Sequence, residues 1–154
     1  MKDRMNMAGN IEIYVDGASR GNPGPSGIGI FIRDKDGKDI IRRGEFLGEM
    51  TSNVAEYQAL IQGLKHLIKL NPHDASKLSV KVFSDSILLI NQLTGNYRIK
   101  SQNLIPLAIQ ARRLVKRFKA VEFTVVERRD NKIADKLANK AMNLMDTIDE
   151  LAQG

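Results

Sequence analysis

The chain of 154 residues contains no cysteine, which excludes disulfides, zinc–thiolate sites and thiol nucleophiles. It also has no apolar run long enough to cross a bilayer, and its N-terminus lacks the apolar core of a signal peptide. We therefore expect a cytoplasmic protein that does not associate with a membrane. A chain of this length corresponds to about one domain, which can bury an adequate core without disulfides or a structural metal.

Aromatic residues are scarce, at 5%, and acidic residues are outnumbered, since 18 Asp and Glu face 24 Lys and Arg for a formal net charge of +6. A basic surface attracts polyanions, so nucleic acid is a natural partner. The same excess of charge also serves solubility without any partner. Composition therefore leaves the function open.

Apolar periodicity predicts an α/β fold with the element order βββαβααβα. Alternating apolar residues indicate five strands, over about residues 11–16, 28–32, 40–47, 80–83 and 121–125. Apolar residues at helical spacing indicate four helices, over about residues 54–70, 86–93, 104–118 and 132–145. Asn53 is the expected N-cap of the first helix, and residues 17–27 are expected to form an irregular loop because they are rich in glycine and proline.

The order of these elements predicts the architecture. Short connections join the first three strands, which favours an antiparallel meander. The strand–helix–strand units that follow favour parallel neighbours and right-handed crossovers. We expect a five-stranded mixed sheet flanked by helices.

Four acidic residues stand out by their position at the ends of predicted elements. Asp16 closes the first strand and Asp85 follows the fourth, whereas Glu56 and Asp135 lie at the starts of the first and last helices. Strand ends and nearby helix starts form the usual crevice for chemistry in such sheets. Carboxylates that converge there would repel one another unless cations lay between them, and oxygen-only ligands suit Mg²⁺ or Mn²⁺.

Each of these residues also has a purely structural interpretation. Asp16 could belong to a turn, Glu56 could complete a capping box with Asn53, and Asp85 could cap the next helix. Asp135 could complement the dipole of the last helix. For each residue alone the structural interpretation suffices, and only the four together favour a metal site.

The same four residues lie in segments that resemble the motifs of the type 1 ribonuclease H family. The segment around Asp16 reads IYVDGASRGNPGPSGIG, and the segment around Glu56 reads TSNVAEYQAL. Asp85 lies in FSDS and Asp135 in NKIADKLAN. The resemblance covers most of the chain, with the motifs in the family's order and in the strand and helix context that the family requires.

This resemblance implies a ribonuclease H-like catalytic domain over residues 11–146, between a flexible N-terminal segment (1–10) and a C-terminal tail (147–154). Its activity would be endonucleolytic hydrolysis of the RNA strand of an RNA/DNA hybrid, leaving 5′-phosphate and 3′-hydroxyl ends. Family members hold two Mg²⁺ ions, with Mn²⁺ as an alternative, and paired ions neutralise charge on the attacking and leaving oxygens. A monomer is expected. The catalytic and metal-binding residues implied are Asp16, Glu56, Asp85 and Asp135.

Substrate recognition is expected beside the carboxylates. A protein tells RNA from DNA mainly through the 2′-hydroxyl, which short polar side chains and exposed backbone amides can meet. The loop 19–24 can supply such amides, although its glycines could equally make only a tight turn. The resemblance places Asn22 and Asn53 against the hybrid and Thr51 at a phosphate of the DNA strand. Gly17 is also among the implied substrate-binding residues.

The sequence departs from the family pattern at two places. Many members carry a mobile histidine shortly before the fourth aspartate, but here the stretch reads VVERRDNKIAD, as in the archaeal-like branch of the family. Arg128 or Arg129 lies there instead, and because arginine stays protonated it can attract phosphate or help release product but cannot act as a base. Ile87 stands where many relatives have a polar residue that reaches the RNA, which predicts weaker binding of the hybrid.

Three other interpretations remain open. The domain could act on double-stranded RNA or at RNA–DNA junctions, because recognition of shape leaves few traces in a sequence. It could bind hybrids without cleaving them, although such a module would not need all four carboxylates. A Rossmann-like nucleotide-binding enzyme is disfavoured because the glycine-rich segment opens no helix with a dinucleotide fingerprint.

Overall fold

The chain begins with an antiparallel meander of three long strands. The computed structural model describes residues 9–151, and in it β1 pairs with β2 and β2 with β3. Alternating apolar residues explain this arrangement, since Ile11, Ile13 and Val15 all lie on one buried face of the first strand. The bounds of the three strands are β1 Gly9–Ser19, β2 Gly24–Asp34 and β3 Asp39–Met50.

Two crossover strands extend the sheet on the other side of β1. The strand β4 (Leu78–Ser84) pairs in parallel with β1, and β5 (Ala120–Val125) pairs in parallel with β4. With a short last strand, β6 (Ile148–Asp149), they complete a six-stranded mixed sheet in the order β5-β4-β1-β2-β3-β6. The predicted α/β class is confirmed.

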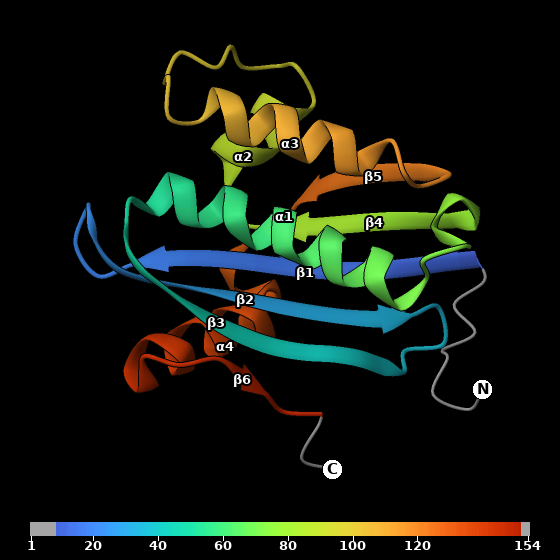
Figure 1. Ribbon diagram of the computed structural model, residues 1–154, viewed down its shortest axis with the longest axis horizontal. Helices are drawn as coiled ribbons and strands as arrows, with labels where there is room; N and C mark the ends of the chain where they lie inside the picture. Colours follow the sequence, from blue (N-terminus) through green and yellow to red (C-terminus); the bar gives the residue numbers. More distant parts are fainter. Residues whose placement is uncertain (1–8, 152–154) are drawn as a thin grey trace.

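Helices cover both faces of this sheet, with α1 on one face, α4 on the other and α3 beside α1 (Figure 1). Among residues 9–151 no helix is long and apolar enough to cross a membrane. The four predicted helices are present, with the bounds α1 Ser52–Leu70, α2 Ile87–Leu93, α3 Ile105–Val115 and α4 Lys132–Leu144. Two single-turn 3-10 helices accompany them, η1 Ala75–Lys77 and η2 Arg128–Asp130.

The strand count differs from the prediction because β6 is a sixth strand. It has only two residues, too few to show an alternating pattern, and it pairs with β3 inside the predicted C-terminal tail. At the other end of the chain, Gly9 and Asn10 belong to β1, while residues 1–8 of the predicted flexible segment lie outside the described residues. The domain boundaries therefore stay predictions.

The prediction of an irregular loop over residues 17–27 is wrong for most of that segment. The pairing of β1 with β2 continues through Ser19, opposite Ser26, so only residues 20–23 turn. Glycine suits these strands because helix backbone lies against them. A Cβ atom on Gly27 would lie 2.7 Å from the carbonyl oxygen of Ala138 in α4.

The start of α1 also differs from the prediction. Thr51, not Asn53, is the N-cap, and its Oγ1 accepts a hydrogen bond from the amide of Val54 at 3.3 Å. Asn53 lies inside the first turn with its side chain exposed. Threonine and asparagine both cap helices well, so residue type alone did not distinguish the two positions.

The two faces of the sheet are packed differently. On the α1 face, isoleucine and valine side chains of the strands meet a helix surface of large apolar residues, among them Leu60, Ile61, Leu64 and Leu67. On the α4 face, small residues let the helix lie close to the sheet. A Cβ atom on Gly29 would lie 1.8 Å from the carbonyl oxygen of Ala134, and Ala138 and Ala141 are fully buried further along α4.

This close approach predicts that Gly29→Ala destabilises the protein. The added methyl group has no room, so we expect the free energy of unfolding to fall by about 1–3 kcal/mol, the usual cost of overpacking. Urea denaturation followed by circular dichroism measures the change. Lys81→Ala, at an exposed position of β4, is the control and should leave stability nearly unchanged. Equal stability of Gly29→Ala and the parent protein would contradict the packing of α4.

Candidate active site

Elements from four parts of the chain bring acidic residues to one edge of the sheet. Asp16 lies near the end of β1, and Asp85 follows directly on β4, its parallel neighbour. The carboxyl ends of parallel strands meet at the same edge, so these two residues are neighbours. Glu56 reaches this edge from the second turn of α1, and Asp135 reaches it from the first turn of α4.

The acidic side chains converge closely. One carboxylate oxygen from each of Asp16, Glu56 and Asp85 lies within 4.8 Å of the other two. Asp135 is not part of that closest group, but it lines the same open pocket, of about 710 Å³, and it is among the carboxylates that raise the pKa of Asp16. The pocket therefore gathers the four predicted carboxylates, three of them at the spacing of ligands around one cation.

Backbone geometry holds Glu56 in place. Its Oε1 accepts a hydrogen bond from the amide of Gly17 at 2.8 Å, and Thr51 is the N-cap of α1, so the alternative interpretation as a capping box with Asn53 does not hold. The helix lies against the strand at this point, because a Cβ atom on Gly17 would come within 2.5 Å of backbone atoms of Ala55 and Glu56. Only glycine at this position lets α1 come so close to β1.

Two neighbours hold Asp135. The Nδ2 of Asn139 donates to its Oδ1 at 3.3 Å, and a guanidinium nitrogen of Arg128 lies 3.6 Å from the same oxygen. Sequence reasoning missed Asn139 as a supporting residue. Its spacing of four residues from Asp135 on a predicted helix was the available indication.

Burial makes the carboxylate cluster electrostatically unfavourable on its own. Asp16 is only 5% exposed, and burial together with the carboxylates of Glu56, Asp85 and Asp135 raises its pKa from 3.8 to about 9. Burial raises the pKa of Glu56 to about 8; the hydrogen bond from Gly17 opposes this rise, and Asp85 adds to it. A divalent cation would relieve this repulsion, and an all-oxygen ligand set suits Mg²⁺ or Mn²⁺.

Comparison with known proteins places this geometry in a family. A family model described as reverse transcriptase-like matches residues 14–141. The crystal structure of ribonuclease H1 from the archaeon Halobacterium salinarum is 36% identical and superposes with a TM-score of 0.80, covering 87% of this chain and 98% of that one. The structure of LC11-ribonuclease H1 in complex with an RNA/DNA hybrid is 35% identical with a TM-score of 0.83, covering 88% and 98%. The chain belongs to the type 1 ribonuclease H family.

This ribonuclease H family member spans only part of its curated relatives. It is 37% identical over 134 residues to a bifunctional protein of Mycobacterium tuberculosis, which is 86% of this chain but 35% of that protein. It is 36% identical over 135 residues to ribonuclease HI of Halobacterium salinarum, which is 88% of this chain and 65% of that protein. The chain thus covers about a third of the mycobacterial relative.

The predicted substrate-binding residues of this ribonuclease H family member lie in and beside the pocket. Gly17 lines it, next to Ser52 at the start of α1. The exposed Asn22 accepts a hydrogen bond from the amide of Ser52 at 3.1 Å, which ties the turn 20–23 to the same helix start. Thr51 and Asn53 flank Ser52 but are not among the lining residues. Their roles in binding substrate stay predictions.

The structure separates the two arginines that stand in place of the histidine. Arg128 lines the carboxylate pocket with an 81% exposed side chain. Arg129 is not among the lining residues, and it pairs at 3.0 Å with Glu127, which is. Ile87, also in the lining, is 57% exposed beside Asp85, so an apolar side chain faces solvent at this edge of the pocket.

The raised pKa of Asp16 predicts how stability depends on pH in EDTA. Folding favours the protonated carboxyl, so ionisation of the unfolded chain destabilises the protein increasingly from pH 3.8 up to about 9. Asp16→Asn removes this effect, so its Tm should exceed that of the parent protein above neutrality and match it below pH 3.8.

Differential scanning calorimetry across this pH range measures the difference in Tm. Asp36→Asn, in an exposed turn, is the matched control and should behave like the parent protein. Saturating Mg²⁺ should raise the Tm of the parent protein more than that of Asp16→Asn, because it binds the folded state through the intact cluster. A variant that is less stable than the parent protein at every pH would contradict the electrostatic account.

Proposed function

We propose that this protein hydrolyses the RNA strand of RNA/DNA hybrids with divalent metal ions held by Asp16, Glu56, Asp85 and Asp135. The observation that carries the proposal is the convergence of the first three carboxylates to within 4.8 Å, with Asp135 in the same pocket. A relative of the same family has been solved with an RNA/DNA hybrid bound. Because the chain covers only about a third of the mycobacterial relative, the proposal concerns this chain alone.

Some residues of the pocket supply negative charge for metal binding, and others hold the charged side chains in position. Asp16 contributes a buried carboxylate that interacts with all three acidic neighbours, and with them it would hold the Mg²⁺ or Mn²⁺ ions. Glu56 is oriented by the Gly17 amide and Asp135 by Asn139, so neither side chain has to be ordered when metal binds. When bound, divalent ions neutralise negative charge on the attacking and leaving oxygens of the phosphodiester, and the products carry 5′-phosphate and 3′-hydroxyl ends.

Recognition of the hybrid falls to the start of α1 and the turn next to it. Ser52 lines the pocket, and its backbone amide donates a hydrogen bond to the side-chain oxygen of Asn22. We assign Asn22 and Asn53 to the groove of the hybrid, and Thr51 to a phosphate of the DNA strand, because all three surround this helix start. Gly17 contributes backbone at the floor of the pocket.

A substrate panel tests the proposal. Labelled RNA/DNA hybrid, duplex RNA, duplex DNA and a duplex with one ribonucleotide are each incubated with Mg²⁺, Mn²⁺ or EDTA. We expect cutting of the hybrid with either metal and none in EDTA. Cutting of duplex RNA or of the single-ribonucleotide duplex alone would change the substrate class. Binding of the hybrid without cleavage would show that the protein is a binding module and not an enzyme.

Loss of the buried carboxylate should abolish hybrid cleavage. We expect Asp16→Asn to lower the rate on the order of 10³-fold, since charge stabilisation by bound metal is the main catalytic contribution. Asp36→Asn is the matched control and should cut at the parent rate. If Asp16→Asn cleaves the hybrid in Mg²⁺ at nearly the rate of the parent protein, the carboxylate pocket is not the catalytic site.

Arg128 is the arginine we assign to phosphate attraction and product release. It is exposed, lines the pocket and lies 3.6 Å from Asp135. We expect Arg128→Ala to lower the steady-state rate roughly tenfold, about the value of one charge-assisted hydrogen bond. Arg113→Ala, on the exposed side of α3, serves as control in the same assay. Equal rates for the two variants would show that Arg128 does not take over the role of the histidine that the sequence lacks at this position.

A further inference from the structure

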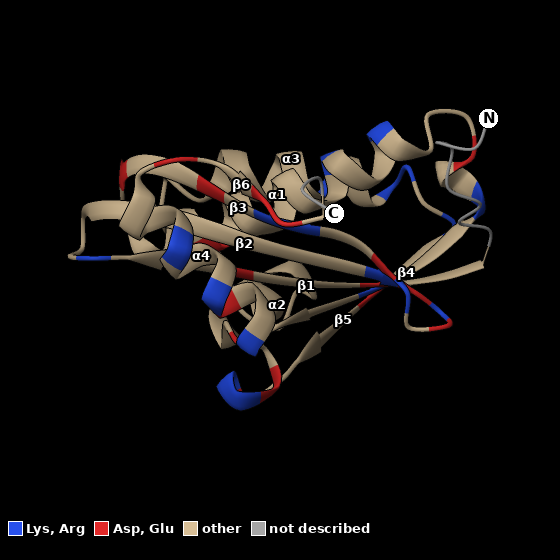
Figure 2. Ribbon diagram, turned by 90° about the horizontal axis from the view of Figure 1, so that it is seen from below, with Lys and Arg blue, Asp and Glu red and all other residues tan. Residues whose placement is uncertain are grey.

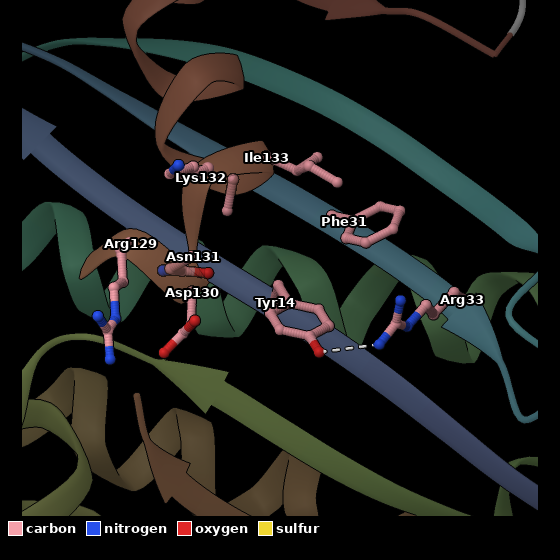
Figure 3. Close-up of a pocket in the computed structure, with 9 residues that line it drawn as sticks. Tyr14, Phe31, Arg33, Arg129, Asp130, Asn131, Lys132 and Ile133 are labelled. Carbon is pink, nitrogen blue, oxygen red and sulfur yellow. Dashed lines mark hydrogen bonds between the residues drawn. The ribbon is translucent and has the colours of Figure 1, made fainter. Parts of the chain in front are cut away.

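A second pocket lies on the other side of the η2 turn from the carboxylates. It has a volume of about 240 Å³ and is lined by residues 129–134 and by Tyr14, Phe31 and Arg33 of the first two strands (Figure 3). None of the four acidic residues of the candidate active site lines it. Pockets for drug-sized ligands run from roughly 300 to 1,000 Å³, so this one would enclose part of such a ligand and leave the rest in solvent.

An unpaired acceptor marks one end of this pocket. Asn131 is 1% exposed, and its Nδ2 donates to the carbonyl oxygen of Val15 at 2.9 Å. Within residues 9–151 its Oδ1 has no hydrogen-bond partner, and Figure 3 shows this oxygen on the side that faces Tyr14. Buried acceptors are nearly always paired, so this one calls for a donor from outside the chain.

Aromatic rings and a guanidinium group form the floor of the pocket. The ring of Tyr14 is stacked on Phe83 with centroids 4.7 Å apart and tilted against Phe31 at 5.6 Å. Arg33 lies over the Tyr14 ring at 5.3 Å and is anchored by Glu12 at 2.7 Å. These contacts, with the hydrogen bond that Arg33 donates to the Tyr14 hydroxyl at 3.1 Å, fix the rings in position, so a planar ligand in the pocket would meet Tyr14 at the edge of its ring.

The start of α4 makes the same pocket attractive to an anion. Asn131 occupies the N-cap position without a side-chain cap bond, so it does not satisfy the amides of the first turn. Lys132 is exposed at this helix start, and basic positions recur along α4 and in the turn before it (Figure 2). One carboxylate, that of Asp130, also lines the pocket and can accept a second N–H group. Helix starts with these features bind phosphate.

We propose that this pocket binds a single nucleotide as its nucleoside 5′-monophosphate. The base lies against the edge of the Tyr14 ring and donates an N–H group to Oδ1 of Asn131. The phosphate lies at the start of α4 beside Lys132. The same chemistry has two sources, a free mononucleotide and the 5′-terminal nucleotide of a strand.

Titration of the full, ¹⁵N-labelled chain in EDTA tests the proposal, because chelation prevents metal-dependent binding at the carboxylates. The probes are AMP, GMP, CMP and UMP, with the matching nucleosides and inorganic phosphate as partial ligands. We expect at least one monophosphate to give saturable shifts at the amides of residues 130–134 and of Tyr14, with partial ligands binding more weakly. A 5′-phosphorylated dinucleotide that shifts the same amides at least as tightly identifies a strand end as the source. Shifts from mononucleotides alone identify the free nucleotide.

Variants connect binding to the named groups. Lys132→Ala should weaken the monophosphate roughly tenfold, whereas Lys136→Ala, one turn further along α4 and outside this pocket, should not. Tyr14→Leu should weaken it as well, with Tyr97→Leu, an exposed tyrosine elsewhere, as control. Asn131→Ala also removes the bond to Val15, so Lys132→Ala and Tyr14→Leu keep the test valid if that variant does not fold.

Three results would overturn the proposal. The first is the absence of shifts at these amides with any monophosphate at millimolar concentration. The second is binding of inorganic phosphate or of nucleosides with the same affinity as the monophosphates. The pocket would then recognise only an anion or only a base. The third is equal affinity in Lys132→Ala and Lys136→Ala.

Discussion

The hydrogen bond from the Gly17 amide to the carboxylate of Glu56 joins α1 to β1 where the acidic residues meet. It depends on the absence of a side chain at Gly17, because any Cβ atom there would overlap the backbone of the helix. With the helix that close, Glu56 reaches Asp16 from one face of the sheet while α4 brings Asp135 from the other face. The geometry of the pocket therefore rests on one glycine in a strand and one acidic residue in a helix.

The convergence of the four carboxylates concentrates negative charge at a partly buried site, which is unfavourable for folding. Asp16 and Glu56 are ionised with difficulty, because burial and their acidic neighbours raise both pKa values. The apolar core between α1 and the sheet stabilises the fold enough to offset the repulsion between these carboxylates. Locally unfavourable arrangements of this kind are usually found at binding sites. A bound divalent cation would offset this repulsion, because its positive charge would neutralise the carboxylates.

The segment between β5 and α4 serves two pockets at once. The η2 turn directs Arg128 toward Asp135 on one side, while residues 129–134 line the smaller pocket on the other. Asn131 anchors this segment through its bond to the carbonyl oxygen of Val15, the residue between Tyr14 and Asp16. This hydrogen bond, together with the packing of α4 on the sheet, holds the start of the helix between the aromatic floor and the carboxylates. A ligand in the smaller pocket would contact the segment that presents Arg128.

Local patterns in the sequence determined which elements form and where the four acidic residues lie along them. Alternation at Ile11, Ile13 and Val15 and helical spacing in α1 and α4 are properties of short windows, so they can be read without knowledge of distant contacts. The motifs around the carboxylates were likewise local, and they indicated the family that the comparisons then showed. The missed features have a different origin. Residues 17–27 look irregular in the sequence because the helices that lie against Gly17 and Gly27, α1 and α4, come from other parts of the chain.

Only the tertiary structure decided how these residues meet. It selected Thr51 as the cap of α1, added β6 beside β3, and brought Arg128 to Asp135. It also set the distances within the acidic cluster and left one oxygen of Asn131 unpaired. The physical reason is that burial, repulsion between carboxylates and close approach of backbones depend on segments far apart in the chain. Residue type and spacing do not encode those quantities until the chain has folded.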